Sequence, residues 1–420
     1  MIPLAQVGFE VSVLAQIVVS LLIFLVIFNM IPMVLLIERK VLGRFQGRYG
    51  PNRVGPFGII QPMVDIVKLA GKEDFTPRNA SKAIFVIAPV ISLFTAVATI
   101  AILPFGDTVT DGLFGANYTL YGIDVSIGVL YAFAFGAIAF YGLMLGGWAS
   151  GSKYSFLGAM RSAAQLVSYE LAAGLSLIGV VMMTGSLSMT EIVNAQSGTW
   201  FIIPQCVGFL VFLVAGFAET NRAPFDLVEA DAELVAGYQT EYGGMRFASY
   251  MLAEYMNMIV LSGIGVTMFL GGWHGPGPSW LGPIWVLVKI FAILFIFMWV
   301  RATLPRLRYD QLMSLGWKIL IPLPKPTVYD PGADVVEVVR GPDPGGMGGA
   351  YRAFGETLRG LKTTLGRLIE GPVTIQYPEE KTPVYPRFRG RHKLHKFESD
   401  VPGVDGLETC VGCSLRAAAC

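Results

Sequence analysis

Three ionisable side chains stand inside stretches of sequence that are otherwise apolar: Glu170, Glu254 and Lys289. An ionised group at the middle of a bilayer costs about 2.5 to 3.5 kcal/mol on insertion scales, so a helix face turned to lipid does not retain one. A carboxylate in a medium of low dielectric constant takes up and releases protons near neutral pH, unlike one in water. The three groups therefore indicate either a proton or ion path, or a pair between Lys289 and a glutamate that only holds helices together.

An acidic loop between two apolar segments adds further titratable groups around the single Arg222. Its acids are Glu219, Asp226, Glu229, Asp231, Glu233 and Glu241, and Tyr238 belongs to the same loop. Like charges at close range titrate as a coupled unit, so such a cluster responds to a nearby change in charge. Apolar residues are interleaved with the acids. We therefore expect a loop folded back into the protein, and an ordinary solvated acidic loop is the alternative.

A basic loop, residues 38–82, is different in kind. Glycine and proline break the backbone between its cations, among them Arg39, Lys40 and Arg48. Within it, polar and apolar residues of 59–72 alternate at helical spacing, which predicts an amphipathic helix at the membrane interface with Asp65 and Lys68 on its polar face. The loop is either an anchor on lipid headgroups or one wall of a mouth that admits an amphiphile with a polar head and an isoprenoid tail.

The elements that position these groups are transmembrane helices. The sequence is 54% hydrophobic and 15% charged, a balance that indicates a polytopic membrane protein rather than a soluble one. About 20 helical residues cross the hydrocarbon, and we predict an all-α transmembrane bundle of seven full spans: 12–37, 83–104, 126–148, 163–184, 200–219, 248–271 and 283–300. An eighth apolar run, 311–323, is too short to span. Gly142 and Gly146 predict a close approach of helix backbones.

Charge asymmetry sets the orientation of these spans. The loop 38–82 is rich in Lys and Arg, and the other basic loops fall on the same side in strict alternation, whereas loops 105–125, 185–199 and 272–282 contain neither residue. Basic loops face the cytoplasm by the positive-inside rule. The N-terminus is therefore predicted to lie outside.

The two charged loops resemble the quinone-chamber membrane subunit of respiratory complex I, which is the H-type subunit of bacterial NADH-quinone oxidoreductase. The matching stretches are 38–40, 58–68 with Lys72 and Glu73, 224–227 with Glu229, Glu233 and Gly237, and 301–313 with Gly316, Trp317 and Lys318. Motifs of this length are specific. The acidic motif departs from the family pattern at Val228, Ala230 and Asp231, which are conservative changes.

The resemblance implies a subunit of a proton-translocating NADH-quinone oxidoreductase in the bacterial inner membrane, with quinone as substrate. It implies no cofactor in this chain, FMN and iron–sulfur clusters in partner subunits, and an adjoining antiporter-like arm, with no nucleic acid. The implied quinone-binding residues are Arg39, Lys40, Arg48, Asp65, Lys68 and Phe225. The implied proton-path residues are Glu170, Glu219, Asp226, Glu229, Asp231, Glu233, Tyr238 and Glu254.

The C-terminal part resembles a different component of the same complex. We divide the chain into a membrane domain at 1–324, a Pro/Gly-rich linker at 325–354 and a cytoplasmic, low-order tail at 355–420. The tail resembles the start of the I-type iron–sulfur subunit, whose first cluster motif has four cysteines. Here Cys410, Cys413 and Cys420 match, but Arg416 replaces the third cysteine. We therefore predict no metal cluster in this chain.

Two other functions remain open from the sequence. A stand-alone ion transporter also places carboxylates at mid-depth, although the large charged cytoplasmic loops indicate a docking face that a lone carrier does not need. The membrane subunit of a related hydrogenase complex shares the same helix pattern.

Overall fold

The computed structural model describes residues 4–109, 118–228, 231–323, 346–372 and 374. All elements discussed here belong to the compact unit Met1–Pro372. The described residues are mostly helical, because backbone groups in lipid find partners only within helices or closed barrels. A two-stranded antiparallel hairpin of β1 (Thr108–Val109) and β2 (Tyr118–Thr119) pairs Thr108 with Thr119.

Six described helices are long and apolar enough to cross a membrane. They are α1 (Leu4–Phe45, membrane-length from Val13), α3 (Lys82–Ile100), α4 (Gly128–Ala149), α5 (Lys153–Thr184), α9 (Gly244–Phe269) and α10 (Gly282–Thr303). They confirm the all-α polytopic bundle.

The predicted span at 200–219 is shorter than expected. Its helix α7 (Cys206–Glu219) has 14 residues, which is about 21 Å of helix. Residues 201–205 form turns instead, and the helix begins just after Pro204, whose nitrogen has no hydrogen to donate. The short helix still connects the two ends of the bundle.

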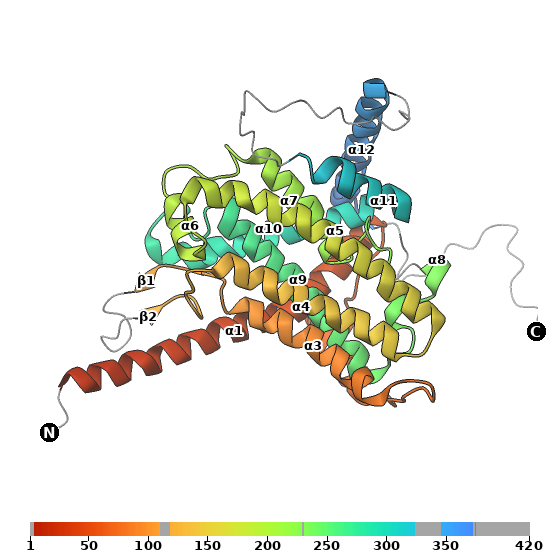
Figure 1. The fold of residues 1–420 in the computed structure, drawn as a ribbon, viewed down its shortest axis with the longest axis horizontal. Helices are drawn as coiled ribbons and strands as arrows, with labels where there is room; N and C mark the ends of the chain where they lie inside the picture. Colours follow the sequence, from red (N-terminus) through yellow and green to blue (C-terminus); the bar gives the residue numbers. More distant parts are fainter. Residues whose placement is uncertain (1–3, 110–117, 229–230, 324–345, 373, 375–420) are drawn as a thin grey trace, which may run out of the picture. The chain divides into compact units, whose positions relative to one another are not determined.

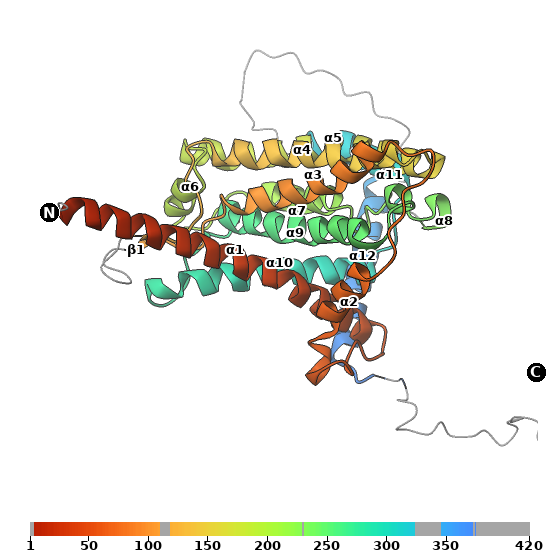
Figure 2. The same ribbon diagram turned by 90° about the horizontal axis from the view of Figure 1, so that it is seen from below.

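Helix α9 is the centre of the bundle. In its most apolar stretch of 18 residues, 78% of the residues are buried. In the corresponding stretches of the other five long helices, 17 to 44% are buried. Figure 2 shows the helices running side by side, with α7 and α9 between α4 and α5 on one side and α1 and α10 on the other. Residues on α9 therefore meet partners from several spans, which makes it the natural place for a buried site.

Helix α4 packs closely against α3 and α9 at two glycines. A Cβ atom added to Gly142 lies 2.1 Å from Ser92 Oγ and 2.9 Å from the Ser92 nitrogen, and one added to Gly146 lies 2.1 Å from the Tyr250 hydroxyl. The Tyr250 hydroxyl donates to the Gly142 carbonyl at 3.1 Å. The predicted close approach at these glycines is therefore confirmed.

Substituting Gly142→Ala is expected to destabilise the bundle by about 1 to 3 kcal/mol, the usual cost of overpacking. The added methyl group meets backbone as well as side-chain atoms of α3, so rotation of one side chain cannot relieve the clash. Thermal unfolding of the purified chain in detergent measures the effect. Gly136→Ala in the same helix is the matched control, because its nearest contact is 3.6 Å. Equal stability of the two variants would contradict the packing argument.

The two ends of the bundle differ in charge. The hairpin and α6 (Met189–Ala195) lie at the end where α1 begins, and α2 (Gln61–Ala70) and α8 (Asp231–Leu234) lie at the opposite end (Figure 1, Figure 2). The loops that contain no Lys or Arg connect helices at the first end, and the basic loops connect them at the second. We call the second end the basic end.

The C-terminal elements are short or lie across the spans. Helix α11 (Tyr309–Leu315) continues into a π-helical turn, Gly316–Leu320, and together they are too short to span, as predicted for the eighth run. A further helix, α12 (Gly346–Ile369), packs on α1 and α10. The sequence patterns did not predict α12, which overlaps the end of the Pro/Gly-rich linker and the start of the tail.

Candidate functional site

A cluster of buried charges joins α1, α9, α10 and the loop after α7. Arg222 lies between two carboxylates, with its Nη1 3.3 Å from Glu38 Oε1 and its Nε 2.8 Å from Glu254 Oε1. Arg301 forms a second ion pair with Glu38, and the Tyr255 hydroxyl donates to Glu38 Oε2 at 2.7 Å. The side chains of Glu38 and Arg222 are only 5% and 8% exposed. Buried charges persist only when paired, and these two acids and two bases balance.

Arg222 keeps its charge in this setting. Burial alone lowers the pKa of a guanidinium, but the carboxylates of Glu254 and Glu38 outweigh burial and raise the pKa of Arg222 above its usual value. The guanidinium also lies over the Tyr255 ring, with its carbon 4.6 Å from the ring centroid, which adds a cation–π contact. Arg222 is therefore a fixed cation against which nearby carboxylates titrate.

The loop that carries Arg222 is folded into the protein. Phe225, Leu227 and Val228 are at most 4% exposed. From α5, Gln165 Nε2 donates to the carbonyls of Ala218 at 2.7 Å and Phe225 at 2.9 Å. The prediction of a loop folded back into the protein is therefore confirmed for 222–228, whereas the Glu233 side chain and Val235 farther along the loop are 51% and 58% exposed.

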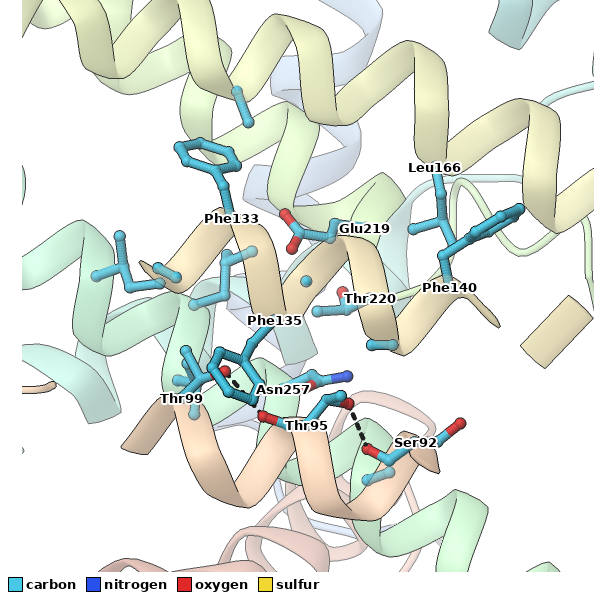
Figure 3. Close-up of a pocket in the computed structure, with 18 of the residues that line it drawn as sticks. Ser92, Thr95, Thr99, Phe133, Phe135, Phe140, Leu166, Glu219, Thr220 and Asn257 are labelled. Atoms are coloured by element: carbon cyan, nitrogen blue, oxygen red, sulfur yellow. Dashed lines mark hydrogen bonds between the residues drawn. The ribbon is translucent and has the colours of Figure 1, made fainter. Parts of the chain in front are cut away.

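A cavity of about 90 Å³ with both apolar and polar lining residues lies between α3, α4, α5, α7 and α9. One water needs at least about 10 to 15 Å³ on this measure, so the cavity has room for several. Its polar lining residues are Ser92, Thr95, Thr99, Glu219, Thr220, Asn221, Tyr238, Tyr250, Glu254 and Asn257. Figure 3 shows Glu219 and Asn257 with the hydroxyl groups of α3 around the same space. A chain of water and hydroxyl groups is the kind of medium through which protons move.

Glu254 belongs to both structures. It pairs with Arg222 in the charge cluster and also lines the cavity. At the other side of the cavity, Glu219 ends α7, and the charge of Glu170 on α5 acts on it. Asp226 in turn acts electrostatically on Glu254. Of the predicted proton-path residues, Glu219, Glu254 and Tyr238 thus line the cavity, and Glu170 and Asp226 lie outside its lining.

The remaining predicted acids are placed differently. Glu233 lies at the surface of α8, where it forms ion pairs with Arg161 and, at 3.4 Å, with Arg306. It contacts arginines rather than the cavity. Asp231 begins α8, and Glu229 lies outside the described residues.

A pH-dependent release of α8 follows from the Glu233 pairs. The hydrogen bond from Arg161 holds the pKa of Glu233 below its usual range. The folded state therefore binds this proton more weakly than the unfolded state, so the stabilisation is complete above the usual carboxylate pKa and is lost as pH falls through the lowered one. Relative to the intrinsic exchange rate at each pH, amide hydrogen exchange at 233–238 is expected to accelerate below about pH 4. In Arg161→Gln, the same amides should exchange faster already at neutral pH. Protection that changes neither with pH nor with this substitution would contradict this account.

The predicted quinone-binding residues gather mainly where α1 ends and α2 begins. Arg39 Nη1 lies 2.5 Å from Asp65 Oδ2, and Gln61 Nε2 donates to Asp65 Oδ1 at 2.9 Å. The Lys40 ammonium lies 5.8 Å from the centroid of the Phe57 ring. Lys68 is exposed in the last turn of α2. This end of α1 therefore presents cations beside the exposed apolar face of the amphipathic helix.

Two further predicted quinone residues make other contacts. Arg48 Nε donates to Gln46 within the same loop at 2.8 Å. Phe225 is buried, and its ring centroid lies 5.5 Å from that of Tyr169 on α5. Neither contact links these two residues to Asp65.

A sequence model described as NADH dehydrogenase matches residues 17–325. The chain belongs to this family. The first H-type subunit of the NADH-quinone oxidoreductase of Geobacter metallireducens is 52% identical over 303 residues, which are 72% of this chain and 91% of that protein. The H-type subunit of Thermomicrobium roseum is 51% identical over 296 residues, covering 68% and 86%. The second H-type subunit of Koribacter versatilis is 45% identical over 333 residues, covering 74% and 94%. The chain is thus a multi-pass membrane subunit of the H type.

The family match ends at residue 325, just after the short eighth apolar run, so α12 and the tail lie beyond it. No group of His, Cys, Asp or Glu that could hold a metal occurs within the described part of the chain. Cys410, Cys413 and Cys420 lie outside that part, and the prediction that they bind no cluster stays a prediction.

Four members of the charge cluster were missing from the predicted site residues: Glu38, Arg222, Tyr255 and Arg301. For Glu38 a signal was present in the sequence. It continues a helix face formed by Ile31 and Val34, which are 3% and 0% exposed, at the i, i+3 and i+7 spacing of a buried stripe. A carboxylate that continues an apolar stripe indicates a buried partner.

Lys289 has a structural role in the described residues. Its ammonium donates to the carbonyls of Leu270, Gly272 and His274 at 2.7 to 2.8 Å. These carbonyls follow the C-terminus of α9, where a cation is favoured by the helix dipole. Lys289 therefore binds backbone carbonyls rather than the glutamate considered in the sequence analysis.

Proposed function

We propose that this chain forms the quinone entry site of a proton-translocating NADH-quinone oxidoreductase and couples quinone reduction to proton movement. The observation that carries the proposal is that Glu254 both pairs with Arg222, at 2.8 Å, and lines the cavity between the helices. A change of charge in the cluster therefore changes the electrostatic potential in the cavity inside the bundle. The names of the relatives supply the reaction.

Quinone enters, in this proposal, at the basic end beside α1 and α2. Arg39, Lys40, Arg48, Asp65 and Lys68 frame a polar mouth for the headgroup, and the apolar face of α2 accompanies the isoprenoid tail. Phe225 contributes an aromatic wall deeper in the protein.

Proton movement follows from electrostatics. Reduction of a quinone consumes two protons and transiently leaves negative charge, which attracts protons toward nearby carboxylates. That negative charge acts first on the acids of the loop after α7, which are Asp226, Glu229, Asp231 and Glu233. Protons then move around the cavity between Glu254, Glu219 and Glu170, with Tyr238 as a hydroxyl partner. Because Arg222 stays charged, it sets the charge balance against which Glu254 changes protonation.

The assembly and orientation belong to the same proposal. FMN and iron–sulfur clusters reside in peripheral partner subunits that dock on the basic end, and the antiporter-like arm adjoins the bundle in a bacterial inner membrane. The basic end faces the cytoplasm, because its loops hold the Lys and Arg residues, and the N-terminus lies outside.

The test is Glu254→Gln in the complete complex, reconstituted in liposomes. Glutamine keeps the shape but neither the charge nor the proton, so NADH-driven proton translocation is expected to fall at least tenfold, the effect of a 1.4 kcal/mol change in a barrier. Electron transfer from NADH to an artificial acceptor at the peripheral arm should remain unchanged. The control is Glu191→Gln on α6, an exposed acid at the other end of the bundle. Full proton translocation by an assembled Glu254→Gln complex would contradict the coupling role.

The alternative functions make different predictions about partners. The hydrogenase reading requires a nickel–iron subunit to co-purify with the chain, and the stand-alone transporter reading requires none. The identity to three H-type subunits favours flavin-containing, NADH-oxidising partners. Mass spectrometry of the affinity-purified assembly, with an assay for bound FMN, separates the three.

A further inference from the structure

Helix α12 lies outside the family match and rests on the end of a membrane span. Trp299 Nε1 on α10 donates to the carbonyl of Leu361 and to Thr364 Oγ1, both at 3.1 Å. The hydroxyl groups of Thr303 and Thr364 are 2.7 Å apart. These contacts fix one face of α12 against the last turn of α10.

The position of that last turn sets the depth of α12 in the membrane. Helix α10 has 22 residues, about 33 Å of helix, which matches a hydrocarbon core of about 30 Å. Thr303 therefore lies at a membrane surface, and Trp299 has the interfacial place that tryptophan prefers. In both ribbon views α12 runs across the direction of the spans (Figure 1, Figure 2). The helix thus lies along the surface rather than through the bilayer.

A second face of α12 is apolar and is left uncovered by the described residues. Leu358, Leu365 and Ile369 are separated by seven and four residues, so they share one side of a helix. They are 49%, 37% and 88% exposed. Helix α12 also packs on α1, and only 22% of the residues in the most apolar stretch of α1 are buried. The exposed face therefore stands beside a span that is itself exposed to lipid.

A third face is polar and carries a small net positive charge, because Lys362 is exposed beside two internally paired arginines. Arg359 Nη1 lies 3.0 Å from Glu356 Oε1, and Arg367 Nη1 lies 2.5 Å from Glu370 Oε2. These arginines are thereby paired within their own helix, which reduces the charge they offer to phosphate headgroups.

We propose that α12 is a membrane-surface helix whose Leu358, Leu365 and Ile369 are inserted among the lipid acyl chains at the basic end of the bundle. The apolar face supplies the binding, and the pairing of Arg359 and Arg367 within the helix leaves only a small contribution from anionic lipid. The helix is then a second membrane attachment placed directly before the C-terminal tail.

The experiment uses the whole complex with single labelling sites. An environment-sensitive fluorescent amino acid is encoded in place of Leu365, Ile369 or Thr363, so the cysteines of the complex, including those in partner subunits, stay unchanged. Position 363 shares the polar side with Arg359 and Arg367 and is the matched control. Each labelled complex is placed in vesicles of neutral phosphatidylcholine and exposed to nitroxide-labelled lipid or to aqueous iodide.

Labels at 365 and 369 are expected to lose most of their fluorescence to the nitroxide lipid and little to iodide, with the reverse at 363. The pattern should persist at high salt and without phosphatidylglycerol. Quenching of 365 and 369 by iodide alone would place the face in water, and protection from both quenchers would place a protein subunit on it. Either result, or a requirement for anionic lipid, overturns the proposal. The readout does not depend on quinone reduction, so it fails or succeeds separately from the proposed function.

Discussion

Replacing Arg222 with methionine is expected to cost about 3 to 5 kcal/mol of folding free energy, the loss typical when one partner of a buried ion pair is removed. Methionine fills similar space, but Glu38 and Glu254 are left as neighbouring buried carboxylates without the cation between them. The variant should therefore unfold at a lower temperature in detergent and should fail to accumulate in membranes. Thermal unfolding of the purified chain and its abundance in the assembled complex measure the two effects.

The control is Arg308→Met. Arg308 also forms an ion pair, at 2.8 Å with Asp310, but its side chain is 75% exposed, and exposed pairs contribute about 0 to 1 kcal/mol. The double variant Arg222→Met with Glu254→Gln removes one unpaired carboxylate and should regain part of the lost stability. Similar unfolding temperatures for Arg222→Met and Arg308→Met would show that the cluster does not hold the four elements together.

The helices of this chain were predictable because lipid imposes one rule on every span. A long apolar run must satisfy its own backbone hydrogen bonds, so it becomes a helix. Hydropathy alone does not mark where such a helix ends. Helix α5 begins at Lys153, ten residues before the predicted start, because polar residues such as Arg161 lower the hydropathy of its first turns without interrupting the helix. Helix α7 begins late, after Pro204, because part of its apolar run forms turns.

The site was predictable one residue at a time but not as an arrangement. Glu254, Glu219 and Glu170 were recognised from their apolar surroundings, and these surroundings are local in the sequence. The pairs were not predictable, because Glu38 is 184 residues from Arg222 and 263 from Arg301. Helical spacing informs only about neighbours three or four residues apart. The tertiary packing around α9 supplies the rest, including the cavity that no sequence pattern encodes.

Removing two polar groups from the cavity lining without changing the cavity's size is expected to slow proton translocation more than any single surface charge change. Thr95→Val and Asn257→Leu, combined, remove a hydroxyl and an amide from its lining and keep nearly the same side-chain volumes. A buried water needs about two to four polar partners, so the loss of two partners weakens the chain of water that connects the carboxylates on α7 and α9. Translocation should fall at least tenfold, a barrier increase of about 1.4 kcal/mol, while the complex still assembles and passes electrons to an artificial acceptor.

The matched control for this pair is Thr184→Val at the end of α5. Its hydroxyl, like that of Thr95, bonds a carbonyl four residues earlier in its own helix, at 3.2 Å, but Thr184 is not among the cavity residues. The control thus removes the same hydroxyl and the same local bond while leaving the cavity lining intact. Unchanged translocation in the double variant, with normal assembly, would mean that protons pass elsewhere. Loss in the Thr184→Val control alone would point to helix geometry instead of cavity water.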